Sequence, residues 1–124
     1  MPRTLSILLA IATAAPAAEK IDFARQVRPI LNSQCAGCHG GVKQASGVSF
    51  IYREQALGKG ETGAPIIVPG DPEESEVMYR VTTDDLDDRM PPPDHGPALT
   101  KEEVATLQQW ISEGARWSEH WSFV

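Results

Sequence analysis

Three stretches of the chain place apolar residues at helical spacing, and together they predict an all-α fold. The first stretch, over residues 23–33, has one apolar stripe that consists of Phe23, Val27, Ile30 and Leu31. Asp22 stands where a helix cap is expected, and Pro29 inside the stripe should kink the helix or restart it. This first helix leads directly into Cys35.

The second predicted helix has a clear start signal. Asp71 can cap it, Pro72 suits the first helical position, and Glu74 completes a pair like a capping box. The helix should then continue to about residue 81. Its inward-facing side chains are Val77, Met78 and Val81.

The third helix is the clearest of the three. Thr100 and Glu103 form a capping box, and the helix should continue to about Glu113, before Gly114 as a left-handed stop. Its inner stripe consists of Val104, Leu107 and Ile111, with Trp110 beside them.

The segments between the helices are rich in Gly and Pro, and they predict long loops. Residues 40–70 contain seven Gly, and two short apolar runs there, 48–51 and 64–68, suit very short strands or extended segments that line a bound group. Residues 53–57 suit one helical turn. Three consecutive Pro should keep residues 89–93 extended. The predicted fold is therefore a small all-α domain with three main helices and long loops, with two very short strands as an option.

The N-terminal region has the pattern of a secretory signal. Arg3 precedes an apolar run over residues 5–12, shorter than the ~20 residues that span a bilayer, and Ala15-Pro16-Ala17 fits a cleavage site. A buried N-terminal helix is the alternative. We expect residues 1–18 to be a signal peptide and residues 19–117 a single domain, periplasmic or otherwise extracytoplasmic, with no membrane span after cleavage.

Aromatic residues gather at the other end of the chain. Trp117 is followed by Trp121 and Phe123, and exposed aromatics without a partner are unusual at a chain end. We expect residues 118–124 to be the start of a downstream linker or domain.

The composition narrows the possible functions. The chain has 11 basic and 17 acidic residues, a net charge of −6, which argues against nucleic acid and anionic lipid as partners. Ten Pro and ten Gly in 124 residues indicate a thin core, which favours a bound prosthetic group. The acidic run from Asp84 to Asp88 lacks the spacing of a calcium loop and suits a solvated surface.

The strongest chemical signal is the run from Cys35 to His39, which has the C-x-x-C-H spacing of a c-type haem attachment motif. Two thiols three positions apart reach the two vinyl groups on one porphyrin edge, and the next imidazole falls under the iron. Cys35 and Cys38 are therefore the candidate covalent attachment sites of one haem c. His39 is the candidate axial ligand of its iron.

Two other readings of this motif stay open. A thioredoxin-type dithiol would need a strand before the motif, where an amphipathic helix is predicted. Zinc would need about four ligands, and the other His residues, His95 and His120, are not paired with a second motif.

The second axial position has several candidates. Met90 lies 51 residues after His39 in a stiff, Pro-rich segment that can aim a thioether at iron. His95 in the same loop would give a bis-His site, and His120 is a weaker candidate. Met78 lies on an apolar helix stripe, where Met usually fills the core. Met90 is also interpretable as a packed loop anchor.

The ligand set decides the expected function. Two strong protein ligands leave no open site on the iron and favour electron transfer, whereas one ligand favours gas binding or peroxidatic chemistry. The alternatives to an electron carrier are a haem-based sensor with a displaceable sixth ligand, and a structural domain with a vestigial haem. No catalytic triad, phosphate loop or carboxylate pair stands out, so the chain itself is not predicted to be an enzyme.

The sequence also suggests partners for His39 and for the haem propionates. His39 should donate its Nδ1–H to a backbone carbonyl, for which residues 46–48 are near enough in sequence. Arg53, Arg80 and Arg89 are each candidates to meet a haem propionate, although a solvated surface position is the favoured interpretation for any one of them.

From Ile21 to Trp117 the chain resembles the planctomycete-type cytochrome c domain. The pieces that carry the resemblance are Phe23 with Val27–Leu31 and the C-x-x-C-H motif; Arg53–Gly60; Ile67–Pro72 with Ser75; Met90–Pro92; and Leu99–Thr100 through Trp110–Ile111 to Gly114, Ala115 and Trp117. The ordered set is far more specific than C-x-x-C-H alone. Where the family often has a Gly-Leu-Arg-Leu-Asp-like strand, this chain has Val48–Ile51.

The resemblance implies an all-α cytochrome-c-like fold, an extracytoplasmic haem, and His39 and Met90 as axial ligands. It also implies an N-terminal position in a longer chain, since residues 120–123 are similar to the segment that opens the downstream part of such proteins. The expected partner is then a redox protein or a downstream domain of the same chain.

Overall fold

The computed structural model describes residues 10–12 and 20–117, and it confirms the all-α prediction. Its elements in chain order are a π-helical turn η1 (Phe23–Val27), α1 (Arg28–Gln34), a 3-10 turn η2 (Ala45–Gly47), α2 (Arg53–Ala56), α3 (Glu76–Thr82) and α4 (Lys101–Ser112). The described residues form no strand, only two isolated bridges. Within them, no helix has the length and apolar character needed to cross a membrane.

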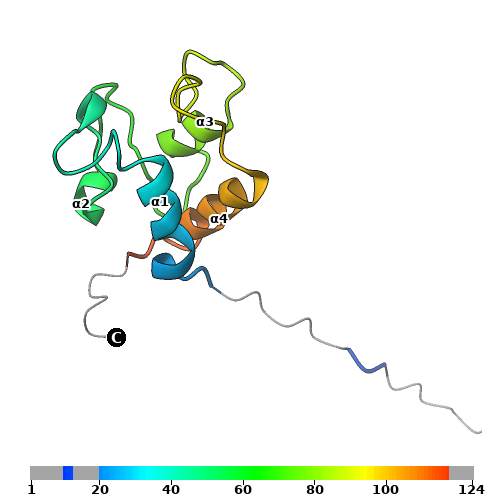
Figure 1. Ribbon diagram of the computed structural model, residues 1–124. Coiled ribbons are helices and arrows are strands. Elements are labelled where there is room, and N and C mark those ends of the chain that lie inside the picture. The colour runs from blue at the N-terminus through cyan, green and yellow to red at the C-terminus, as the bar shows by residue number, and fades with distance from the viewer. Residues whose placement is uncertain (1–9, 13–19, 118–124) are drawn as a thin grey trace, which may run out of the picture.

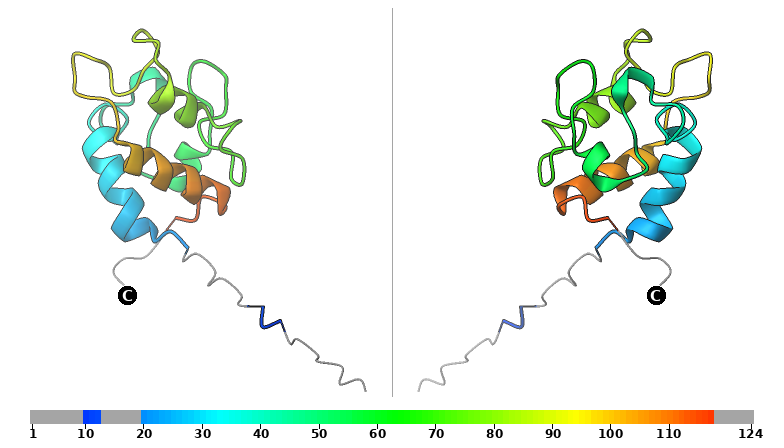
Figure 2. Two further views of the ribbon diagram at one scale, coloured as in Figure 1. Left: turned by 90° about the vertical axis from the view of Figure 1, so that its right-hand side faces the viewer. Right: turned by 90° about the vertical axis from the view of Figure 1, so that its left-hand side faces the viewer.

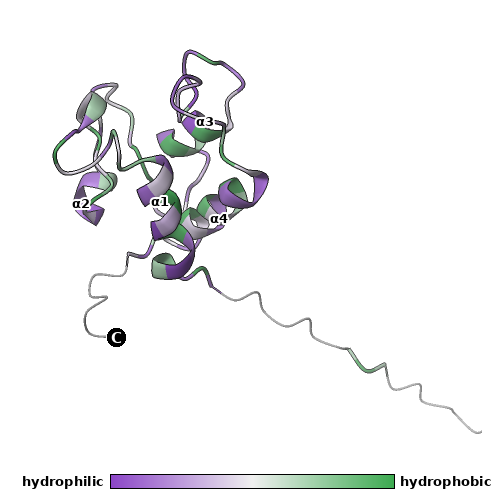
Figure 3. Ribbon diagram, viewed as in Figure 1, coloured by the Kyte–Doolittle hydropathy of each residue, from purple (hydrophilic) through white to green (hydrophobic). Residues whose placement is uncertain are grey.

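Helices α1 and α4 gather at one end of the molecule, while α3 and the long loops lie at the other (Figures 1 and 2). An aromatic cluster holds the helical end together. The Phe23 ring lies 5.6 Å from Trp110 and 4.4 Å from Trp117, centre to centre. The Ile21 N–H also donates to Glu113 Oε1 at 2.8 Å, so the start and the end of the described domain meet here. Apolar residues of η1, α1 and α4 belong to one buried core, in which α4 packs against η1 (Figure 3).

The first helix begins and restarts as the sequence predicts. Asp22 caps η1 through its Oδ1, which accepts a hydrogen bond from the Arg25 N–H at 3.2 Å. A new helix, α1, begins at Arg28 with Pro29 in its first turn, where the missing N–H removes no helical hydrogen bond. The predicted inner stripe of Phe23, Val27, Ile30 and Leu31 is buried.

The predicted start of the second helix is wrong. Asp71 caps only a turn, through its Oδ1 and the Glu74 N–H, and α3 begins at Glu76. The buried Ser75 hydroxyl accepts from the Val68 N–H and donates to the Asp71 carbonyl, both at 2.8 Å, which holds residues 68–75 as a loop. The first two amides of α3, on residues 76 and 77, donate to the carbonyls of residues 65 and 66. The inward stripe of Val77, Met78 and Val81 is confirmed.

The third helix, α4, matches its sequence signals closely. Thr100 Oγ1 accepts from the Glu103 N–H at 3.1 Å, and the Glu103 carboxylate accepts from the Thr100 N–H at 3.0 Å, which is the complete capping box. Gly114 follows with a φ of +107°, as expected of a left-handed stop.

The optional strands at residues 48–51 and 64–68 are absent from the described structure. Each run makes single backbone hydrogen bonds, such as Phe50 N–H to His39 O at 2.8 Å and Ile66 N–H to Gly58 O at 3.0 Å, and no ladder. The other expectation for these runs is met, since Val48, Phe50, Ala64 and Ile66 line a cavity.

Candidate functional site

A cavity of about 470 Å³ lies between the Cys35–His39 turn, the loop over residues 60–66, α3 and the loop after it. Its volume falls in the range of roughly 300–1,000 Å³ that is usual for cofactor and ligand sites. Cys35, Cys38 and His39 line it from one side, and Met90 lines it from a segment far away in the sequence. The fold thus brings all four predicted site residues to one cavity.

Local backbone contacts shape the Cys35–His39 turn. The end of α1 carries the turn, since the Cys35 N–H donates to the Leu31 carbonyl at 3.0 Å. The His39 N–H donates to the Cys35 carbonyl at 2.9 Å, and the Ala45 N–H donates to the Cys38 carbonyl at 2.9 Å. The backbone alone therefore places both thiols and the imidazole on the same cavity wall.

Gly40 is a structural requirement of this turn that sequence analysis missed. A Cβ atom at this position would overlap the carbonyl oxygen of Ala36, so any other residue would push the turn apart. The signal was present in the sequence, because the Gly follows the motif directly.

The structure has no disulfide between Cys35 and Cys38, and the environment of Cys35 favours the neutral thiol. Burial, with a smaller contribution from the negative charge of Glu103, raises the pKa of the Cys35 thiol from 9.0 to about 12. The thiol is therefore neutral at physiological pH, which disfavours its attack on an oxidant or a disulfide because the thiolate is the reactive form.

The His39 ring packs against a residue that sequence analysis did not single out. The Phe50 ring lies edge-on to His39, with ring centres 6.0 Å apart and an angle of 86° between the planes. The alternation of Val48 and Phe50 on one side of the 48–51 run was the available signal. His39 Nδ1 is buried and has no hydrogen-bond partner among the described residues, so the expected carbonyl acceptor at residues 46–48 is wrong.

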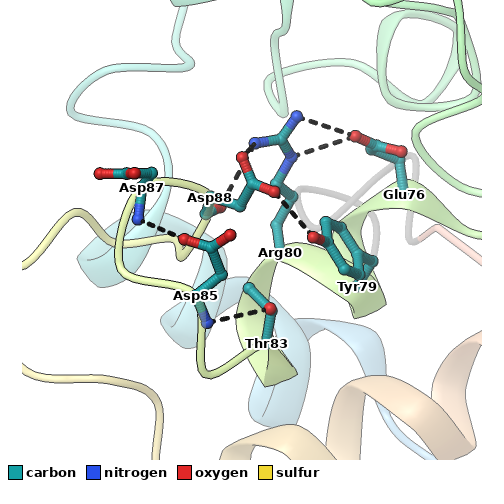
Figure 4. A network of polar contacts seen from close by, with 7 residues as sticks. All are labelled: Glu76, Tyr79, Arg80, Thr83, Asp85, Asp87 and Asp88. Carbon is teal, nitrogen blue, oxygen red and sulfur yellow. Dashed lines mark hydrogen bonds and ion pairs between the residues drawn. The ribbon is translucent and has the colours of Figure 1, made fainter.

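Met90 is held at the cavity by helix α3. Its N–H donates to the carbonyl of Arg80 at 2.8 Å. The Arg80 guanidinium, paired with Glu76 at 3.0 Å, also donates to the Asp88 carbonyl at 3.3 Å. The Tyr79 hydroxyl donates to Asp88 Oδ2 at 2.7 Å, so neighbouring side chains of α3 hold the segment just before Met90 (Figure 4).

The three candidate propionate partners all have protein partners. Arg53 Nε donates to the Ala115 carbonyl at 3.4 Å, away from the cavity lining. Arg89 donates to two carbonyls of its own loop and also lies outside that lining. Arg80 lines the cavity while it is paired with Glu76 and Asp88. Arg80 is therefore the one of the three with access to a bound group.

The structure distinguishes the other candidates for the second axial ligand by whether they line the cavity. Met78 is a buried core residue outside the cavity lining, as its helix position predicts. His95 lines the same cavity as Met90, with its side chain 59 % exposed. His120, together with Trp121 and Phe123, lies outside the described residues. No group of three or more His, Cys, Asp and Glu able to hold a metal ion occurs among the described residues.

Residues 35–94 match the model of the planctomycete cytochrome C family, and this span includes Cys35, Cys38, His39 and Met90. This segment belongs to the planctomycete cytochrome C family. The resemblance drawn from the sequence is thereby confirmed, and the cytochrome c segment is a haem-binding domain. No curated protein and no solved structure matches the chain.

The residues of this cytochrome c segment fit a haem. Two reduced thiols and an imidazole lie on one wall of a cavity whose other walls carry apolar side chains such as Phe50, Ile66 and Val77. Thiol, imidazole and thioether are the donors that haem c chemistry uses. The lining surface of the cavity is mostly apolar, which suits a porphyrin plane.

Proposed function

We propose that this domain is an extracytoplasmic electron carrier with one covalently bound c-type haem. The observation that carries the proposal is the convergence of Cys35, Cys38, His39 and Met90 on one cavity, although Met90 lies 51 residues after His39. The group would supply an iron that takes up and releases one electron. The proposed partner is a redox protein or a downstream domain of the same chain.

The two thiols would hold the haem covalently. Each S–H would add across one vinyl group, with sulfur on one carbon and hydrogen on the other, so that no oxidant is consumed and nothing leaves. This step needs both cysteines reduced. The raised pKa of the Cys35 thiol, about 12, supports that state in an oxidising compartment, because a neutral thiol forms a disulfide with Cys38 slowly.

The proposed axial ligands are His39 and Met90. His39 is fixed by the backbone of its turn, and the Met90 backbone is hydrogen-bonded to α3. Two protein ligands held by a rigid fold leave the coordination unchanged when the electron arrives or leaves, which suits electron transfer and excludes small ligands from the iron.

The test is an absorption spectrum of the full chain, produced in a host with periplasmic haem c maturation. We expect haem to remain attached after denaturation, and the oxidised protein to show the weak long-wavelength band of Met–iron coordination. Met90→Leu should lose this band. Met78→Leu, the matched control in the core, should keep it, because a Met-to-Leu exchange nearly conserves volume.

Three results would count against this proposal. Loss of haem on denaturation would show that the haem is not covalently attached. A band that persists in Met90→Leu would show that Met90 is not the sixth ligand. Rapid carbon monoxide binding to the reduced wild type would favour a sensor with a displaceable ligand, since a stably coordinated iron has no free site.

A further inference from the structure

Met90 and His95 line the same cavity from one loop, so either side chain could serve as the sixth ligand. The contacts of Arg89 bear on this choice. Arg89 Nε donates to the Pro91 carbonyl at 3.1 Å, and one of its terminal nitrogens, Nη2, donates to the Gly96 carbonyl at 3.0 Å. One guanidinium thus ties together the two ends of the segment that carries His95.

The Arg89 side chain does not line the haem cavity. It lines a second cavity of about 550 Å³ together with Leu86, Leu99 and Lys101, and it is absent from the lining of the first. Arg89 therefore contacts backbone carbonyls and not the site itself. Charged donors to carbonyls are among the stronger hydrogen bonds in proteins, and the planar guanidinium presents two of them at a fixed angle.

The two ends of the loop are held unequally. Met90 is attached to helix α3 by its own N–H, which donates to the Arg80 carbonyl at 2.8 Å. His95 has only a local contact, its N–H to the Pro92 carbonyl at 2.9 Å, and a distant Asp94 carboxylate at 3.9 Å. Without the Arg89 bonds, nothing among the described contacts ties Gly96 to residues 89–91.

We propose that Arg89 is a positioning residue that selects Met90 over His95 as the sixth ligand. It does so by hydrogen bonds to the carbonyls of Pro91 and Gly96, at the two ends of the 91–96 loop. The inference rests on the proposed function, since it assumes a haem with His39 as the first axial ligand. The Arg89 bonds fix the course of the chain directly after Met90 and hold His95 at the exposed rim of the cavity.

The experiment compares Arg89→Gln with Arg53→Gln in the haem-loaded full chain. Arg53 is the matched control because its Nε also donates to a backbone carbonyl, that of Ala115, away from the cavity. We expect Arg89→Gln to lose the Met–iron band and to gain a low-spin bis-His spectrum, and Arg53→Gln to keep the wild-type spectrum. Arg89→Lys should restore part of the band, because Lys keeps one charged donor but not the fork.

A double variant identifies the replacing ligand. In Arg89→Gln with His95→Ala, we expect the bis-His spectrum to disappear and the reduced iron to bind carbon monoxide. If Arg89→Gln loses the band but the added His95→Ala changes nothing, selection against His95 is wrong. If Arg89→Gln keeps the band at wild-type intensity, the whole inference is wrong while the proposed function stands. Absence of the band from the wild type would overturn both.

A hydrogen-exchange measurement on the haem-loaded full chain separates loop closure from general damage. In Arg89→Gln with His95→Ala, compared with His95→Ala alone, we expect the amide hydrogen of residue 95 to exchange roughly tenfold faster or more, which corresponds to about 1.4 kcal/mol of lost protection. The amides in the middle of α4 should be unchanged, because the hydrogen bonds described for the Arg89 guanidinium go to Pro91 and Gly96 and not to that helix. Equal acceleration throughout the chain would show that the variant simply unfolds and would overturn the assignment of a local role.

Discussion

The two walls of the haem cavity are built in different ways. The Cys35–His39 wall is one continuous turn at the end of α1, and its geometry comes from backbone hydrogen bonds between near neighbours. The Met90 wall is a loop with no regular structure, held by the side chains of Arg80 and Arg89 and one backbone bond to α3. We expect a wall held by its own backbone to tolerate substitution of surface side chains, and a wall held by single side chains to be sensitive to the loss of one of them.

The largest expected effect distinguishes the residues that attach the haem covalently from the residue proposed as the sixth iron ligand. Replacing both Cys35 and Cys38 by Ala should abolish covalent haem entirely, because no other described thiol faces the cavity. Met90→Leu should leave covalent haem at the wild-type level, since the thioethers do not involve it. Haem staining of the denatured protein on a gel measures both. Equal haem loss in Met90→Leu would mean that the two walls are not independent.

A second prediction compares the packing behind the two walls. Phe23→Ala, in the aromatic cluster under α1, should cost about 3–5 kcal/mol of unfolding free energy in the haem-free chain. Leu86→Ala, in the loop before Met90, should cost less than about 0.5 kcal/mol, because that side chain is 59 % exposed. Urea unfolding gives both values. Similar costs would contradict the view that only the first wall rests on a packed core.

The sequence predicted the backbone-held wall better than the side-chain-held one, for physical reasons. Helix α1, its restart at Pro29 and the capping box of α4 follow from contacts within four residues, which local patterns record. The predicted start of α3 was wrong because a hydrogen bond between Ser75 and Val68, seven residues apart, keeps the preceding residues in a loop. The spacing of apolar residues along the chain does not reveal such a contact. The amides of residues 76 and 77 likewise bond to a remote segment.

The same distinction applies to the site. Cys35, Cys38 and His39 follow from spacing, and Met90 follows from the stiffness of its Pro-rich segment. The partners of Arg80 and Arg89 could not be predicted, because an Arg side chain is long and its acceptors are carbonyls that every residue carries. Sequence patterns therefore leave three candidates for a propionate partner, and the fold shows that one of them, Arg80, lines the cavity.

A third prediction concerns pH and the first wall. The pKa of the Cys35 thiol is raised from 9.0 to about 12 in the folded chain. Between these values the unfolded chain loses the proton and the folded chain keeps it, so the folded state loses about 1.4 kcal/mol per pH unit as pH rises. Below pH 9 this contribution to stability is fully present. Urea unfolding of the haem-free chain at several pH values measures the slope.

Cys35→Ala is the control for this pH dependence. The variant has no thiol at this position to titrate, so its stability should fall less steeply than that of the wild type above pH 9. Identical slopes for the two chains would show that the Cys35 thiol is no better protected when folded than when unfolded.

The smallest expected effect is on the second wall and comes from Tyr79. Its hydroxyl donates to Asp88 Oδ2 at 2.7 Å, two residues before Met90, and this bond raises the pKa of Tyr79. Tyr79→Phe should therefore accelerate amide exchange at Met90 slightly, while Tyr52→Phe, the same change at an exposed site outside the cavity lining, should not. In the wild type the bond is present below the ordinary pKa of Tyr and is lost as pH rises through the raised one. The exchange rates of the wild type and Tyr79→Phe, each corrected for intrinsic base catalysis, should thus converge at high pH. Persistence of the difference there would mean that the phenyl ring, and not the hydroxyl, holds the loop against α3.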